Sequence, residues 1–287
     1  MSGVLLTATE RLGLIAVKIE RAKKHIVDLE REIGAFLATN PYRVIEKIDA
    51  KITYEMSHVT PVPGSIVAIS GDVIQNLRSA LDHLANQLMF VRLGVPTSNR
   101  ESEFPVRNTS REYKATLRRM VKTGLLRGDA FDALLRIEAY KRGKGHDLWT
   151  LNRLNNIDKH RIILTAGSAF RSMNIGAFGS RMLREYAIAE EAARKSRGEA
   201  PWPYAAADIP IMDAFFRPGD NMCPLKVGDV LFVNTASDGK MDPEKDFRFD
   251  VAFDEPEVVK GKPMLETLKH FADLISNTVL MFRPFLA

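Results

Sequence analysis

Long stretches of helical periodicity constrain this 287-residue chain more than any other feature. Apolar residues recur every three or four positions over Leu5–Ala38, Ser65–Leu93 and Pro263–Phe282, with charged residues between them. A shorter helix is expected over Asp147–Arg161, with Asp147 as its N-cap. Each apolar face must be covered by another element, so the sequence predicts that these four helices pack together.

Strand patterns fall mainly in the second half of the chain. Tyr42–Val59 alternates apolar and charged residues and predicts a long strand or hairpin arm. Further strands are expected at Ile162–Thr165, Phe170–Phe178, Ile211–Phe216, Asp229–Thr235 and Phe247–Phe253. Shorter helices are expected at Ser110–Leu126, Asp129–Tyr140 and Met182–Arg197.

The order of these elements indicates the fold class. Helices come early and at the end, and strands come mostly late, so the sequence predicts an α+β fold and not alternating βαβ units. We expect a single domain over residues 1–287, with its helical part mainly in 1–166 and 262–287 and its strand-rich part in 167–261. An antiparallel sheet built mainly from the C-terminal half is expected to cover one side of the helices.

Composition limits the class of protein. With 45% hydrophobic and 27% charged residues, the chain resembles an ordinary globular protein. The formal charge of +5 is small for this length, so it permits binding to nucleic acid without indicating it. The N-terminus has no signal-peptide pattern, and no apolar run reaches the ~18 residues of a membrane span. We therefore expect a cytoplasmic protein that does not enter a membrane.

Motifs for cofactors and metals are missing. Residues 143–146, Gly-Lys-Gly-His, lack the leading glycine and the Ser or Thr of a phosphate-binding loop. The single Cys223 excludes a disulfide framework and a multi-cysteine zinc site. Asp82, His83, Asp158 and His160 could in principle form a carboxylate–imidazole metal site, but the side chains of an adjacent Asp-His pair point apart on a helix. The sequence predicts no metal and no cofactor.

Two polar clusters within the predicted helices carry most of the chemistry. In residues 76–83, Arg78 and Asp82 are four positions apart and can pair on the helix surface. On a helical wheel, Gln75, Ser79, Asp82 and Asn86 form a polar stripe. Arg78 lies on one border of this stripe and His83 on the other, about 140° apart at 100° per residue. The plain interpretation of this cluster is a solvated face with one ordinary ion pair.

The second cluster occupies residues 152–161. On a helical wheel Asp158 and Arg161 share the apolar face of this helix, and Asn155 lies at its edge. Charged groups cost free energy to bury unless they are paired. One interpretation is a structural Asp158–Arg161 ion-pair network. The other is that this cluster, with His160, faces the first cluster across a groove between the helices.

A third feature is the basic run from Arg111 to Arg127. It holds six basic residues against the single acidic Glu112. Such a run is either a solvated helix face or the binding surface for an anionic partner.

Two resemblances follow from these motifs. The pattern of Gly71-Asp72, NLRSALDHL at 76–84, Phe104-Pro105 and IDKHR at 157–161 resembles a widespread family of uncharacterised bacterial proteins over about the first 165 residues. Arg78 and His83 also satisfy R-x4-H, which resembles the motif of HEPN-type helical domains.

The HEPN resemblance implies metal-independent RNA cleavage in a groove between two copies of the chain. His83 would then polarise the 2′-hydroxyl or protonate the leaving oxygen, and Arg78 would stabilise charge on the phosphate. The remaining polar residues of the two clusters would bind RNA or a nucleotide in the same groove: Asp82, Asn155, Asp158, His160 and Arg161.

Two functional hypotheses remain open. The first is a HEPN-like RNA- or nucleotide-binding protein that forms a homodimer and acts as a metal-independent ribonuclease. The second is a non-catalytic helical scaffold or binding protein in which both clusters are structural. Catalysis requires Arg78 and His83 to be accessible and within reach of one phosphate, whereas a scaffold requires Asp158 and Arg161 to be buried and mutually paired.

Overall fold

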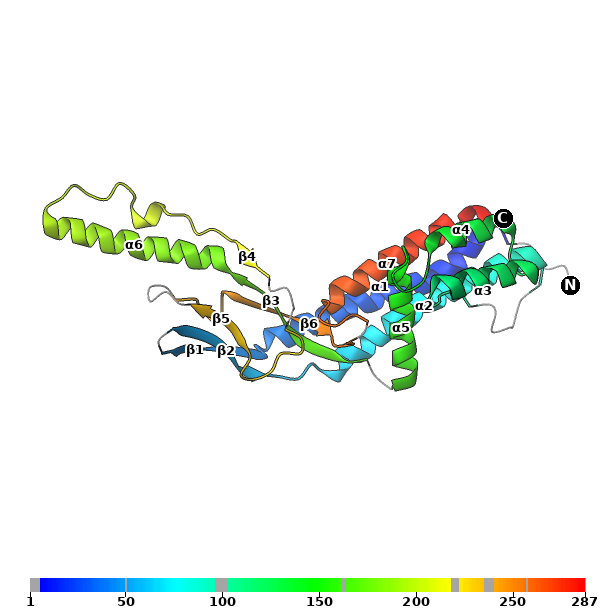
Figure 1. The fold of residues 1–287 in the computed structure, drawn as a ribbon, viewed down its shortest axis with the longest axis horizontal. Helices are drawn as coiled ribbons and strands as arrows, with labels where there is room; N and C mark the ends of the chain where they lie inside the picture. The colour runs from blue at the N-terminus through cyan, green and yellow to red at the C-terminus, as the bar shows by residue number, and fades with distance from the viewer. Residues whose placement is uncertain are drawn as a thin grey trace.

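The protein is elongated, with a helical bundle at one end and strands followed by a projecting helix at the other (Figure 1). The computed structural model describes residues 6–49, 51–95, 103–161, 164–217, 222–234, 240–256 and 258–286, without the side chains of residues 160 and 161. In this part of the chain no helix is both long and apolar enough to cross a lipid bilayer.

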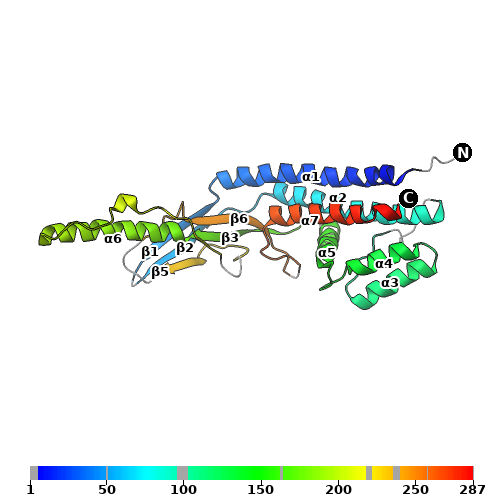
Figure 2. The ribbon, with the colours of Figure 1, turned by 90° about the horizontal axis from the view of Figure 1, so that it is seen from above.

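The bundle consists of α1 (Ala8–Ala38), α2 (Gly64–Leu93) and α7 (Met264–Met281), which lie side by side, with α5 (His146–Arg161) running across them (Figures 1 and 2). Their apolar faces form one core, as the periodicity predicted. Thr7 and Glu10 form a capping box that starts α1. The structure confirms the four long helices to within about three residues at each end.

Helices α3 (Ser110–Lys122) and α4 (Gly128–Ile137) form a hairpin on the side of the bundle away from α1 (Figure 2). The Tyr113 hydroxyl donates a hydrogen bond to the Leu134 carbonyl at 2.6 Å and joins the two helices. Both helices end earlier than predicted. Gly124, with φ +75°, follows the end of α3, and Glu138, with φ 55°, ends α4, so the helical path cannot continue.

The strands form two antiparallel sheets of three strands. One has the order β1 (Tyr42–Ile48), β2 (Ile52–Val59) and β5 (Val230–Asn234). The other has the order β4 (Phe215–Phe216), β3 (Ala166–Asn174) and β6 (Phe247–Phe253). Aromatic and apolar side chains of both sheets share a second core.

These sheets confirm the α+β class and correct one detail of it. Two sheets stand where one was predicted, and they extend beyond the end of the bundle instead of covering its side (Figures 1 and 2). The physical reason is the second core, in which Tyr54 packs on Phe247 at a ring separation of 5.5 Å. Each sheet therefore buries its apolar face largely against the other sheet.

The largest difference from the sequence-based prediction concerns α6 (Ile175–Arg197), which begins seven residues before the predicted start at Met182. The expected strand Phe170–Phe178 ends at Asn174, whose side chain accepts a hydrogen bond from the Ala177 amide at 3.0 Å and caps the helix. The expected strand Ile211–Phe216 shrinks to the two residues of β4. Residues 164–165 of the expected strand Ile162–Thr165 are not in a strand, and its first two residues lie outside the described residues.

Candidate functional site

Arg78 and Asp82 form an ion pair on α2, with Nη2 and Oδ1 2.9 Å apart. The same guanidinium nitrogen donates a hydrogen bond to the Phe104 carbonyl at 3.1 Å, and the Phe104 amide donates to Asp82 Oδ1 at 2.9 Å. We call this arrangement the Arg78–Asp82 clamp, because it fastens the main chain at Phe104 to α2. The i, i+4 pair predicted from the sequence is therefore present.

Arg78 of the clamp is buried and Asp82 is half-buried, which the sequence did not predict. The Arg78 side chain is 6% exposed, because Phe104 and Val106 cover this part of α2 and enter the bundle core. Burial raises the pKa of the Asp82 carboxyl, while the Arg78 charge and the Phe104 amide oppose that shift. Arg78 Nη1 is buried with no hydrogen-bond partner among the described atoms.

His83 lies next to the clamp in sequence but in a different environment. Its side chain is exposed, whereas the Arg78 side chain points into the covered side of α2. Catalysis through R-x4-H would require both groups to reach one phosphate from solvent. The arrangement of Arg78 does not meet this requirement, and the catalytic roles of Arg78 and His83 stay a prediction.

The second cluster lies on α5, where it crosses α2. Asn155 is buried, and Asp158 is half-buried with its carboxylate against Gly71 of α2. A Cβ atom on Gly71 would lie 2.8 Å from Asp158 Oδ1, so the glycine creates the space for the carboxylate. Burial and the nearby charge of Asp72 raise the pKa of Asp158.

The predicted Asp158–Arg161 ion pair stays a prediction. The side chains of His160 and Arg161 lie outside the described residues, and none of the described side chains forms an ion pair with Asp158. The two clusters do approach each other, since Lys159 of α5 lowers the pKa of Asp82 through its charge. The predicted packing of α5 on α2 is confirmed, with Gly71 as a contact point that the sequence did not indicate, while the groove between the two clusters stays a prediction.

A basic ridge runs along α3. Arg111, Lys114, Arg118 and Lys122 are all exposed and lie within about 80° of one another at 100° per residue. We call these four residues the α3 ridge. None of them pairs with an acidic side chain among the described residues, because Glu112 is engaged with Thr109 in the capping box that starts α3.

A pocket of about 410 Å³ lies at the C-terminal end of the α3 ridge. Its lining comes from α2, the last turn of α3 and the start of α4: Arg92, Val121, Leu126, Arg127, Gly128 and Asp129. The N-cap residue of α4, Arg127, makes no side-chain cap, and the helix dipole adds positive potential to that of the two arginines, although the Ala130 amide donates to Asp129 Oδ1 at 2.8 Å. Arg127 pairs with Asp129 at 2.7 Å, which offsets part of this charge.

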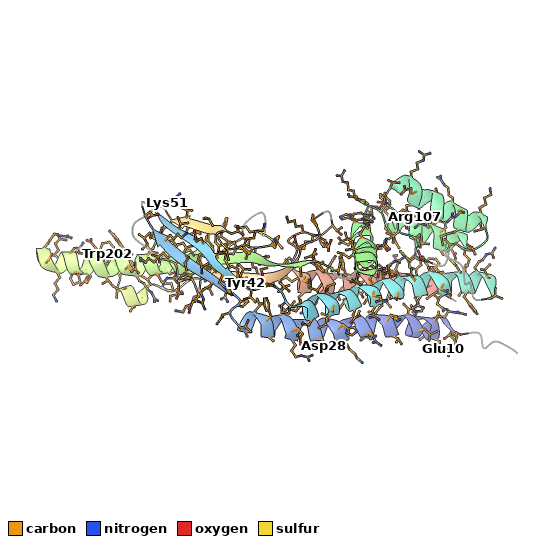
Figure 3. The ribbon with its side chains drawn as sticks, turned by 90° about the horizontal axis from the view of Figure 1, so that it is seen from below. Glu10, Asp28, Tyr42, Lys51, Arg107 and Trp202 are labelled. Atoms are coloured by element: carbon orange, nitrogen blue, oxygen red, sulfur yellow. The ribbon has the colours of Figure 1, made fainter. Side chains whose placement is uncertain are left out.

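The segment that carries α3 is positioned by several contacts besides the clamp. Arg107, labelled in Figure 3, donates one hydrogen bond to the Thr116 hydroxyl of α3 and another to the Val106 carbonyl. Trp149 of α5 donates to Asn108 Oδ1 at 3.0 Å. The clamp and these bonds hold the start of α3 at a fixed place on the bundle.

Other reactive groups form no evident centre. Within the described ranges, no three His, Cys, Asp or Glu side chains are grouped as metal ligands. Burial raises the pKa of the Cys223 thiol to about 11, so it is protonated at neutral pH and a poor nucleophile. His270 of α7 contacts Asp147 of α5 at 2.8 Å, a pairing across 123 residues that no sequence spacing could reveal.

Comparisons of the chain with protein-family models, with curated proteins and with solved structures return no match. The resemblances to the bacterial family and to HEPN-type domains therefore rest on the sequence motifs alone.

Proposed function

We propose that the protein is a non-catalytic RNA-binding protein that holds backbone phosphates on the α3 ridge. The observation that carries the proposal is a line of four exposed cations that pair with no acid in the described part of the chain. Like charges at i, i+4 destabilise a helix by a few tenths of a kcal/mol for each pair. A polyanion laid along the ridge removes this repulsion and releases its own counterions.

The unpaired ridge differs from the other charged helices. On α1, Lys23 pairs with Glu20 and Arg31 pairs with Asp28. On α6, Arg197 pairs with Glu190. Arg21 and Lys24 of α1 also lack an acidic partner among the described side chains, but Asp28 and Glu32 lie within about 20° of Arg21 on the helical wheel, whereas the ridge sector of α3 holds no acid.

The ridge favours binding that depends on phosphate and not on base sequence. Tyr113 is the aromatic residue of α3 and is buried, so α3 offers no ring on which a base could stack. Arg92 and Arg127 in the adjoining pocket extend the basic surface beyond the helix. We expect affinity for single-stranded RNA of any sequence, with a strong dependence on salt.

In this proposal the two polar clusters support the ridge instead of cutting RNA. The Arg78–Asp82 clamp fixes Phe104, six residues before α3 begins, and its burial argues against contact between Arg78 and a phosphate. This is the scaffold role that the sequence left open. Incubation with RNA in EDTA is expected to give no cleavage by the wild type, and loss of a cleavage activity in His83→Ala would contradict the non-catalytic role.

The direct test is fluorescence anisotropy with a single-stranded RNA of about 20 nucleotides, a length that exceeds a typical single-strand site. If four cations each neutralise one phosphate, the slope of log K against log salt is about −2.8. The double variant Lys114→Glu/Arg118→Glu should weaken binding by about tenfold or more and reduce the slope by about half.

The matched control is Arg21→Glu/Lys24→Glu on α1. Both residues are exposed, the change of net charge is the same, and α1 lies on the opposite side of the bundle from α3 (Figure 2). This control should bind RNA nearly as well as the wild type. Equal losses in the two variants would mean that only net charge matters, and absence of salt-dependent binding by the wild type would reject the proposal.

A further inference from the structure

The region that projects from the sheets consists of α6 and the segment 198–216 that returns from it. We call residues 175–216 the arm. It contains the short helix η2 (Ala206–Asp208) and β4, and in both views it extends away from the bundle (Figures 1 and 2). Trp202, at the far end of the arm, lies at the opposite end of the molecule from Arg107 (Figure 3).

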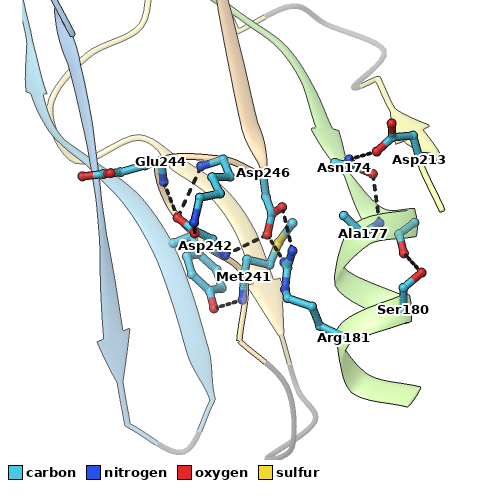
Figure 4. A network of polar contacts seen from close by, with 12 residues as sticks. Asn174, Ala177, Ser180, Arg181, Asp213, Met241, Asp242, Glu244 and Asp246 are labelled. Carbon is cyan, nitrogen blue, oxygen red and sulfur yellow. Dashed lines mark hydrogen bonds and ion pairs between the residues drawn. The ribbon is translucent and has the colours of Figure 1, made fainter. Parts of the chain in front are cut away.

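The base of the arm is fixed by polar contacts (Figure 4). Arg181 of α6 donates hydrogen bonds to both carboxylate oxygens of the buried Asp246, next to β6. Asn174 donates to Asp213 Oδ1 at 2.7 Å, and the Met212 amide donates to Ser180 Oγ at 3.0 Å. The arm is therefore held in one direction relative to the sheets.

Beyond its base the arm buries little apolar surface. The buried residues of α6 are Ala177, Ser180 and Ala187, all of which have small side chains. A helix of this length is marginal in water unless packing covers an apolar face. Leu183 and Tyr186, on a different face of α6, are 53% and 59% exposed.

Exposed apolar side chains are concentrated in the arm. It holds nine of the 21 large apolar residues that are exposed in the described chain, within about one-seventh of the sequence. A large side chain presents about 150–250 Å². At roughly half exposure, the four aromatic and five smaller aliphatic side chains together expose on the order of 800 Å², spread over more than one face of the arm, against about 800 Å² per partner in a standard interface.

We propose that the arm is the surface through which two copies of this chain form a symmetric dimer. The exposed apolar area of the arm is of the size that one partner contributes to a standard interface, and Ile175, Leu183 and Tyr186 lie within about 80° of one another on α6. The arm contains five basic and six acidic residues, so two copies do not repel each other. The outer edge of β4 is also unpaired among the described strands, and two such edges can pair antiparallel about a two-fold axis.

The charge pattern disfavours a lipid surface as the occupant. Helices that lie on membranes carry Lys and Arg on the polar face. Over the whole arm the five cations are matched by six acids, and Arg197 of α6 contacts both Glu190 and Glu199. This inference is independent of RNA binding, which the α3 ridge would perform at the other end of the molecule.

The test is sedimentation velocity of the full chain at about 10 µM, a concentration at which standard-size interfaces are commonly populated. The wild type is expected to sediment as a dimer. Leu183→Glu/Tyr186→Glu places charges in the apolar contact and should weaken dimerisation by about 100-fold. Circular dichroism should show unchanged helix content, and the milder Tyr186→Ala should give a smaller loss of dimer.

The matched control is Val17→Glu/Val27→Glu on α1, where both valines are more than 60% exposed. This variant should remain a dimer, as should Lys114→Glu/Arg118→Glu on the α3 ridge. A monomeric wild type overturns the proposal, and so does a dimer that survives the arm variant or is lost in the α1 control. Monomers that float with vesicles of phosphatidylcholine and phosphatidylserine would assign the arm to lipid instead.

Discussion

The helices α3 and α6 lie at opposite ends of the molecule and present opposite surfaces. The α3 ridge carries charge of one sign, without paired acids among the residues that the structure describes, and Val121, at 38% exposure, is the large apolar residue that α3 exposes. The arm carries balanced and partly paired charges with a concentration of exposed apolar side chains. The difference indicates partners of different chemistry: a polyanion for α3 and an apolar protein surface for α6.

Each of these helices is also fixed by its own polar network. The Arg78–Asp82 clamp holds the segment before α3, and Arg181 with Asp246 holds the base of α6. The two networks share no residue. Changes at one end should therefore leave the other end intact, and the predictions below use this separation.

The largest expected difference between the two ends is the salt dependence of their binding. Raising the salt concentration about tenfold should weaken RNA binding by about 600-fold, the consequence of a slope near −2.8. Dimerisation through apolar surface should persist over the same range, because screening does not weaken apolar contacts. Anisotropy and sedimentation measured in the same buffers test this. A dimer that dissociates in parallel with RNA release would show that charge governs both ends.

Removal of the clamp should have the next largest effect, a loss of folding stability. Arg78→Ala removes the buried guanidinium together with its bonds to Asp82 and to the Phe104 carbonyl, and should lower the free energy of unfolding by about 2–3 kcal/mol. Arg118→Ala on the ridge is the matched control, with a change within about 0.5 kcal/mol. Denaturant unfolding measures both values.

The location of the Arg78→Ala effect is the sharper test. Hydrogen exchange should show lost protection around Phe104 and along α3, while the amides of α6 keep theirs. Equal loss of protection in both helices would contradict the independence of the two ends.

The glycines of α6 should give effects of opposite sign. A Cβ on Gly176 would lie 2.4 Å from the Ala214 nitrogen, so Gly176→Ala must push α6 away from the returning segment. We expect a loss of about 1–3 kcal/mol that is confined to the arm. Gly179 has no atom within 4 Å of its Cβ position, and Gly179→Ala should stabilise α6 by up to about 1 kcal/mol. Thermal unfolding tests the signs, and equal effects would mean that the arm base is not close-packed.

The boundary of α6 illustrates what the sequence could and could not predict. Periodicity located the four long helices, because a helix with a wide apolar face has apolar residues every three or four positions along its own segment. It failed at residues 175–181, where Gly176 fell within the strand expected at Phe170–Phe178 and the start of α6 was placed at Met182. The close approach of Gly176 to Ala214 spans 38 residues and has no local signal.

The candidate site shows the same limit. The pairing of Arg78 with Asp82 follows from i, i+4 spacing and was predicted. The burial of Arg78 depends on Phe104, 26 residues further along the chain, and was not predicted. Likewise, the wheel placed Asp158 on the inward face of α5, but the space that it occupies exists because residue 71 of α2 is a glycine.

Asp158 offers the smallest effect and the most direct check of that contact. Burial and Asp72 raise the pKa of its carboxyl, so the folded protein binds its proton more tightly than the unfolded chain does. Stability contributed by this proton is present below the ordinary Asp pKa and is lost as the pH rises through the raised value. Asp158→Asn removes the ionisable group and should stabilise the fold at neutral pH by about 0.5 kcal/mol, with no gain in acid.

The measurement is denaturant unfolding of wild type and Asp158→Asn over a pH series. In an Asp72→Asn background the gain should shrink, because one of the two causes of the raised pKa is gone. A gain that does not vary with pH would assign the effect to packing against Gly71. A loss of about 3 kcal/mol in the free energy of unfolding would instead indicate the predicted ion pair between Asp158 and Arg161, because the substitution would leave the Arg161 cation without its partner.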